Sequence, residues 1–140
     1  MIFVSRPLRI GKSDTYGIYY PRETIEAMVA EWESEGKPPI YGLLGQSIET
    51  IRQGIIDTEC VATQVVGMSI DDEGLVVQQE VLEVSKGYEL QNYLQVMDDE
   101  PTLIGMKVSP YMTGKQQKRP DGDYDIVYMK MRAFLFEVMT

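Results

Sequence analysis

The spacing of apolar and polar positions along the chain predicts a strand-rich fold with two longer helices. An acidic turn that ends in glycine, Asp71-Asp72-Glu73-Gly74, separates two apolar runs and predicts a β-hairpin. Pro7 predicts an edge position or a break in the first strand. The apolar alternation changes phase near the C-terminus, which predicts a β-bulge there. We expect strands over residues 2–10, 16–20, 40–44, 60–70, 75–84, 103–112 and 124–138.

The stretch PRETIEAMVAEWESEG has the pattern of an amphipathic helix. Pro21 is favoured in a first helical turn, and Gly36 is favoured just beyond a last turn. Trp32 lies on the apolar stripe, so we interpret it as a core residue rather than a ligand platform. The stripe consists of Ile25, Met28, Val29 and Trp32. A second helix is predicted over residues 85–97.

These elements predict an α+β fold in which a mostly antiparallel sheet forms a partly closed β-barrel with two main helices. Closure is expected because a small domain with many strands has few other ways to protect its strand edges. The 140 residues suit one domain over residues 1–140. The polar stretch TGKQQKRPDGD is interpreted as a loop before the last strand.

The composition excludes several classes of function. A net charge of −9 argues against binding to nucleic acid or to an anionic membrane. No apolar run is long enough to span a membrane. The chain has no histidine and a single cysteine, Cys60, so we expect no zinc site, no cofactor and no internal disulfide.

Ser109 is the candidate nucleophile, because it stands on an apolar strand just before a break, in VSPY. A nucleophilic serine needs a base within hydrogen-bond reach, normally an imidazole, and this chain has none. Lys107 lies two residues earlier and would share a strand face with Ser109. It is a weak alternative base, because a Ser–Lys pair needs a desolvated, neutral lysine.

The stretch YGLLGQS, residues 41–47, is a glycine-rich corner at the end of an apolar run. Gly42 and Gly45 lack the lysine and the helix context of a phosphate-binding loop. The corner therefore presents Gln46 for some other purpose.

From about Tyr16 to Val138, the order of these elements resembles the prohead (capsid maturation) serine proteases of tailed phages, which are related in fold to the herpesvirus assemblin proteases. In that family the corner reads like G-x-L-G-H-P, and its histidine is the catalytic base. The corresponding position here is Gln46. The family's serine motif, like G-V-S-S-R-G, maps loosely onto residues 105–109 with Ser109 as the nucleophile, and Glu137 is the nearest acid on the last strand.

The resemblance implies a protease fold without intact catalytic residues, in which Gln46 and Ser109 are vestigial positions. An amide has no useful protonation equilibrium near neutral pH, and the loss of a triad base costs several orders of magnitude in rate. We therefore expect a phage structural protein (a decoration, minor capsid or core component) that binds capsid or other virion proteins. It would form a homo-oligomer or join a large assembly, in the virion or in the host cytoplasm during assembly.

Two other hypotheses about the function also fit the sequence. One is an active maturation protease that uses Ser109 with an unconventional base. The other is an unrelated β-barrel binding module.

Overall fold

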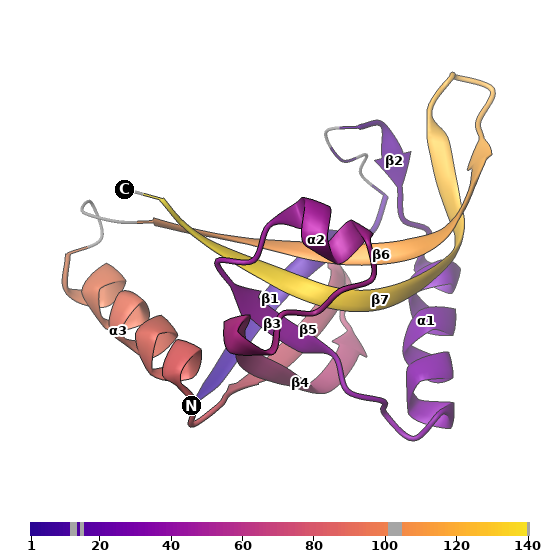
Figure 1. Ribbon diagram of the computed structural model, residues 1–140. Coiled ribbons are helices and arrows are strands. Elements are labelled where there is room, and N and C mark those ends of the chain that lie inside the picture. Colours follow the sequence, from indigo (N-terminus) through magenta and orange to yellow (C-terminus); the bar gives the residue numbers. More distant parts are fainter. Residues whose placement is uncertain (12–13, 15, 101–104, 140) are drawn as a thin grey trace.

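The computed structural model describes residues 1–11, 14, 16–100 and 105–139, which fold as a curled sheet with helices at its two ends and on one face (Figure 1). The strands are β1 Ile2–Arg9, β2 Ile18–Tyr19, β3 Tyr41–Leu44, β4 Val61–Ile70, β5 Gly74–Val81, β6 Gly105–Lys118 and β7 Tyr124–Met139. The helices are α1 Arg22–Ser34, α2 Ile48–Arg52 and α3 Ser85–Asp99, with a short 3-10 helix η1 at Thr58–Cys60.

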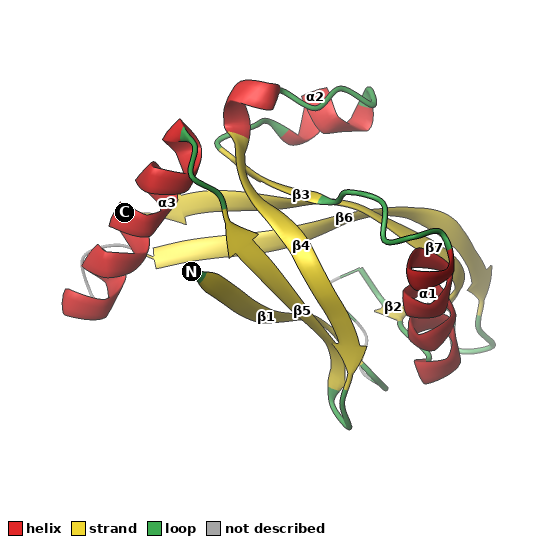
Figure 2. Cartoon of the chain, turned by 90° about the horizontal axis from the view of Figure 1, so that it is seen from below, coloured by secondary structure: helices red, strands yellow, loops and turns green. Residues whose placement is uncertain are grey.

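The sheet has seven strands in the described residues, in the order β1-β5-β4-β3-β7-β2, and β6 pairs with the other edge of β7. It curls into a half-barrel, with α1 and α3 at opposite ends (Figure 2). The predicted α+β class is confirmed. The expectation of a mostly antiparallel sheet is too simple, because β7 pairs in parallel with both β2 and β3.

The main core fills the concave side of the half-barrel. Phe134 and Phe136 of β7 lie there almost fully buried, together with Leu90 of α3 and Ile25 of α1. Trp32 is only 7% exposed and its Nε1 donates to Pro38 O at 2.9 Å, which confirms it as a core residue. A smaller apolar cluster lies on the opposite face of the sheet, under α2; we call this face the α2 face.

Several local sequence patterns formed the turns and strand irregularities that they predicted. Helix α1 ends at Ser34 and Gly36 follows with φ +83°, a conformation that glycine adopts without strain. The acidic turn joins β4 to β5 as predicted, and the first strand is an edge strand whose register shifts at Pro7. The last strand carries the predicted irregularity, since its pairing with β6 shifts register twice.

One expectation about the elements is wrong, and one element was missed. The polar stretch that begins at Thr113 is not a loop, because β6 continues to Lys118 and only a tight turn separates it from β7. The resulting hairpin projects from the half-barrel (Figure 1). The five-residue helix α2 was not expected. The predicted start of strand β6, at residues 103–104, lies outside the described residues.

Candidate functional site

The glycine corner turns the chain sharply at the end of β3. Gly45 has φ +81° and its N–H donates to Phe136 O of β7 at 3.3 Å, which fixes the corner on the sheet. The side chain of Gln46 then turns toward the segment after α2. Its Nε2 donates to Ile55 O at 2.8 Å, and its Oε1 accepts from the Asp57 N–H at 2.9 Å. Both ends of the amide therefore hold one loop in place.

The residue after Gln46 is the N-cap of α2. Ser47 caps this helix, because its Oγ accepts from the Thr50 N–H at 3.3 Å. Ile51 of α2 is buried on the α2 face together with Leu43 and Ala133. The corner thus places a small helical cover over the end of β3.

Ser109 lies on the α2 face of the sheet. It stands opposite Leu135 of β7, and Leu135 in turn stands opposite Leu43 of β3. Directly paired residues project from the same face, so the side chains of Ser109 and Leu43 share it. Lys107 stands opposite Glu137, two positions along the same strands, and so shares this face as well.

The structure brings Ser109, Lys107 and Glu137 onto adjacent strands, whereas Gln46 follows a strand on the far side of β7. Two strand spacings, roughly 10 Å, separate β3 from β6. No hydrogen bond joins Gln46 to Ser109, and the Oγ of Ser109 makes no hydrogen bond to any described residue. The amide of Gln46 is engaged by its own loop instead.

The side chain of Lys107 is exposed in this arrangement, and its role as an alternative base for Ser109 stays a prediction. Among the described residues it has no carboxylate within 4 Å, although Glu137 stands opposite.

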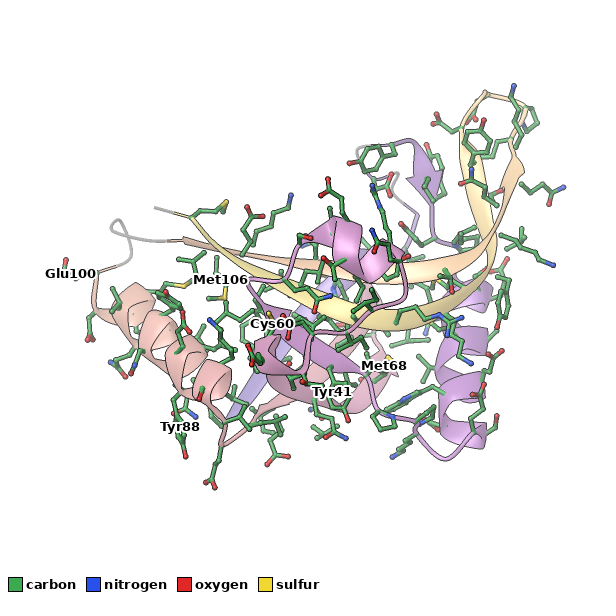
Figure 3. The ribbon with its side chains drawn as sticks, in the orientation of Figure 1. Tyr41, Cys60, Met68, Tyr88, Glu100 and Met106 are labelled. Carbon is green, nitrogen blue, oxygen red and sulfur yellow. The ribbon has the colours of Figure 1, made fainter. Side chains whose placement is uncertain are left out.

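Cys60, at the end of η1, packs against the α2-face cluster (Figure 3). Burial raises the pKa of its thiol, and the Asp57 carboxylate raises it further, with Sγ at 3.6 Å from Oδ2. A raised thiol pKa lowers the population of the reactive thiolate. Within the described ranges, no cluster of three acidic or cysteine residues could hold a metal ion, and no helix is long and apolar enough to cross a membrane.

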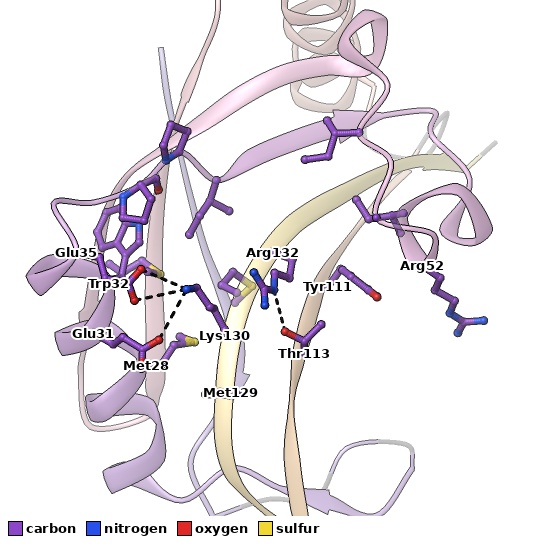
Figure 4. A pocket seen from close by; sticks show the side chains of 18 residues that line it. Met28, Glu31, Trp32, Glu35, Arg52, Tyr111, Thr113, Met129, Lys130 and Arg132 are labelled. Carbon is purple, nitrogen blue, oxygen red and sulfur yellow. Dashed lines mark hydrogen bonds and ion pairs between the residues drawn. The ribbon is translucent and has the colours of Figure 1, made fainter.

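A groove of about 590 Å³ lies beside α1 and was not expected from the sequence (Figure 4). We call it the α1 groove. Six segments line it: α1 with Glu35 just beyond it, residues 38–40, the region from Ile51 to Ile56, β4 through Met68, β6 and β7. Its floor is rich in methionine and includes Trp32. Tyr111 lines the α1 groove and also packs on the α2 face, and it lies two residues along β6 from Ser109. The groove therefore extends close to Ser109.

The polar residues of the α1 groove fall into two groups (Figure 4). Lys130 lies between Glu31 of α1 and Glu35, the C-cap of that helix, with its Nζ at 3.2 Å from Glu35 and 3.9 Å from Glu31. Arg132 instead donates to the neutral hydroxyl of Thr113 at 2.8 Å. Arg52 makes no side-chain hydrogen bond or ion pair with any described residue.

No known protein family and no curated protein matches this sequence. Among solved structures, the chain is similar to the capsid assembly protease gp21 of bacteriophage T4, with a TM-score of 0.72 and 13% sequence identity. The match covers 97% of this chain and 81% of that one. This chain has a capsid-protease fold.

The comparison confirms the expected prohead-protease-like fold. At 13% identity the likeness concerns the fold, so the assignment of Gln46 and Ser109 to vestigial catalytic positions stays a prediction. The relation to the assemblin proteases and the loss of activity also stay predictions.

Proposed function

We propose that this chain is a phage virion or capsid assembly protein that binds other proteins and does not cleave them. Its support is a fold similar to that of a phage capsid protease, combined with the state of Gln46. That side chain lies where the resemblance places the catalytic base, and both ends of its amide are hydrogen-bonded to residues 55 and 57. This single observation carries the proposal.

The chemistry of peptide cleavage explains why this observation matters. A serine attacks a peptide bond only when a base accepts its proton, and later that base protonates the leaving amine. An amide can do neither near neutral pH. Replacing the base by a side chain that instead holds a loop turns a catalytic position into a structural one.

Protein binding is the function that such a scaffold can keep. The outer edge of β6 carries no partner strand in the described structure, and exposed edges accept an added strand from another chain. The α1 groove offers a second surface with an apolar floor. Under this proposal the partners are capsid or other virion proteins, and the chain acts in the virion or during its assembly.

A test of activity separates this proposal from the hypothesis of an active protease. The purified chain is treated with a fluorophosphonate probe, and separately with capsid and scaffold proteins, alongside a Ser109→Ala variant. We expect no labelling above that of the variant and no processed products. Labelling or processing that disappears in the Ser109→Ala variant would establish an active serine and refute the proposal.

A test of location addresses the assembly role itself. Particles and assembly intermediates of the phage that encodes the chain are purified, and their proteins are quantified by mass spectrometry. We expect the chain at a fixed ratio to the major capsid protein in at least one of these stages. Its absence from every stage would contradict an assembly role.

A further inference from the structure

The α1 groove contains cations that the described part of the chain does not neutralise. Three cations and two carboxylates line it, and Lys130 faces both carboxylates. Arg52 and Arg132 remain, and neither has a carboxylate within 4 Å among the described residues. In a chain with a net charge of −9, two such arginines beside an open groove favour an anionic partner.

The C-terminal end of α3 has the opposite imbalance. Asp98, Asp99 and Glu100 follow one another there, and all three are exposed. A helix dipole places partial negative charge at this end, so carboxylates are unfavourable and cations would be favourable. The last turn contains no basic residue, and in the described chain only the Gln95 amide, at 3.2 Å, donates to this group.

One copy of the chain cannot bring these two surfaces together. Helices α1 and α3 lie at opposite ends of the sheet in both ribbon views, and Glu100 is at the far end from α1 (Figure 3). A second copy can present its α3 end to the groove of the first.

We propose that the chain self-associates head to tail, with the α3 end of one copy docked in the α1 groove of the next. The carboxylates of Asp98 and Asp99 would meet Arg132 and Arg52, since charge-assisted hydrogen bonds to arginine are among the stronger polar contacts. The groove volume of about 590 Å³ lies within the range of known binding sites. Methionine side chains in the floor can adapt to an incoming helix end.

A head-to-tail contact uses two different surfaces on each copy, so each docked copy still offers a free groove or a free α3 end. Repetition produces a ring if the rotation closes and a filament if it does not. The inference rests on the proposed assembly role, for which it names one partner: another copy of the same chain.

Sedimentation velocity of the full chain tests this. We expect the average sedimentation coefficient to rise with concentration at an ionic strength of about 0.1 M, where the Debye length of about 10 Å screens the repulsion between the net charges of two copies more than it screens a direct ion pair. The rise should disappear at about 1 M, where the Debye length is about 3 Å. A chain that remains monomeric at the lower ionic strength up to millimolar concentration would overturn the proposal, and the groove's occupant would then be a different protein.

Charge reversal identifies the surfaces. The groove variant R52E/R132E and the helix-end variant D98K/D99K should each associate at least about tenfold more weakly than the wild type. An equimolar mixture should associate again, because each variant restores the charge pairing of the other. Association that persists in the single variants, or a mixture that stays monomeric, would overturn the assignment.

A matched control reverses two cations elsewhere. Lys115 and Lys118 are exposed on the projecting β6–β7 hairpin, and K115E/K118E changes the net charge as much as the groove variant. This control should still associate.

A wild-type chain that is monomeric yet present in purified particles would refute self-association alone, whereas a self-associating chain absent from all particles would refute the assembly role alone.

Discussion

Gln46 shows how far a single residue can be interpreted from sequence. The resemblance predicts that Gln46 takes the position where a protease family places a histidine, and the amide of glutamine cannot act as a base near neutral pH. Its actual partners, Ile55 and Asp57, lie 9 and 11 residues away in a segment without regular periodicity. Hydrogen bonds across such a loop depend on the tertiary fold, so only the structure could reveal them.

The first prediction concerns the loop that Gln46 holds. Gln46→Ala removes two hydrogen bonds, each contributing roughly 0.5–1.5 kcal/mol net, so the free energy of unfolding should fall by about 1–2 kcal/mol. The Asp57 amide should also exchange its hydrogen faster. Urea unfolding and hydrogen exchange measure the two effects. Gln53→Ala, in the same exposed loop, is the control and should change neither; unchanged exchange in Gln46→Ala would contradict the structural role.

Gly42 is the second informative residue of the corner. A Cβ there would collide with Thr63 Oγ1 and would stand 2.5 Å from the Phe136 ring and 2.8 Å from Gln79 Oε1. Thr63 and Gln79 are both fully buried, and the hydroxyl donates to the amide oxygen at 2.5 Å. The absence of a side chain at Gly42 therefore makes room for a buried polar pair in the core.

Gly42→Ala should consequently destabilise the fold by roughly 1–3 kcal/mol or more, the usual cost of overpacking a core. Urea unfolding provides the measurement. Gly105→Ala is the matched control, because a Cβ at that position would lie 3.9 Å from the Met139 side chain, an ordinary van der Waals contact. Equal stability of the two variants would show that the space around Gly42 can relax.

At the scale of elements, the sequence was informative where the pattern is local. Helix α1 and the β4–β5 hairpin each carry their own periodicity and turn residues, and both formed as predicted. Helix α2 has five residues, too few to display a period, and β6 beyond Thr113 is polar. The second half of β6 is a strand because β7 pairs with it, and this is a tertiary cause.

The β4–β5 hairpin yields a prediction about pH. The Arg6 guanidinium lowers the pKa of Asp71 to about 2, helped by the N–H groups of Glu73 and Gly74. Because the folded-state pKa lies below the ordinary value of 3.8, this contribution to stability is present above about pH 4 and is lost as the pH falls toward 2.

Thermal melting of the wild type and of Asp71→Asn tests this window. The wild type should have the higher Tm near neutral pH, and the difference should shrink as the pH falls from about 5 to about 2. Asp72→Asn, one residue further along the same turn, is the control. The Asp72 side chain makes no comparable hydrogen bonds in the described structure, so this variant should show no such trend in Tm. A Tm difference that stays constant down to pH 2 would show that Asp71 does not act through its charge.

At the scale of the whole molecule, the sequence predicted the fold class, and the resemblance predicted the kind of fold. It could not predict the α1 groove, because the segments that line it are spread along the chain from α1 to β7. The parallel pairing of β3 with β7 has the same origin, since about 90 residues separate Tyr41 from its partner Ala133. The groove and the pairing of β3 with β7 are therefore products of the complete fold.

The expectation of a single domain leads to the last prediction. One buried cluster joins Trp32 of α1 to Leu90 of α3 through the sheet, so the two ends should unfold together. Trp32 is the only tryptophan and reports on the α1 end. A second variant, Trp32→Phe with Tyr93→Trp, places the probe in α3, where Tyr93 packs against the same cluster. In each protein, tryptophan fluorescence and far-ultraviolet circular dichroism should give coincident urea transitions. If the fluorescence of the α3 probe changes at a lower urea concentration than the circular dichroism, then α3 unfolds as a separate unit. The acidic end of α3 would in that case belong to an element that opens independently of the half-barrel.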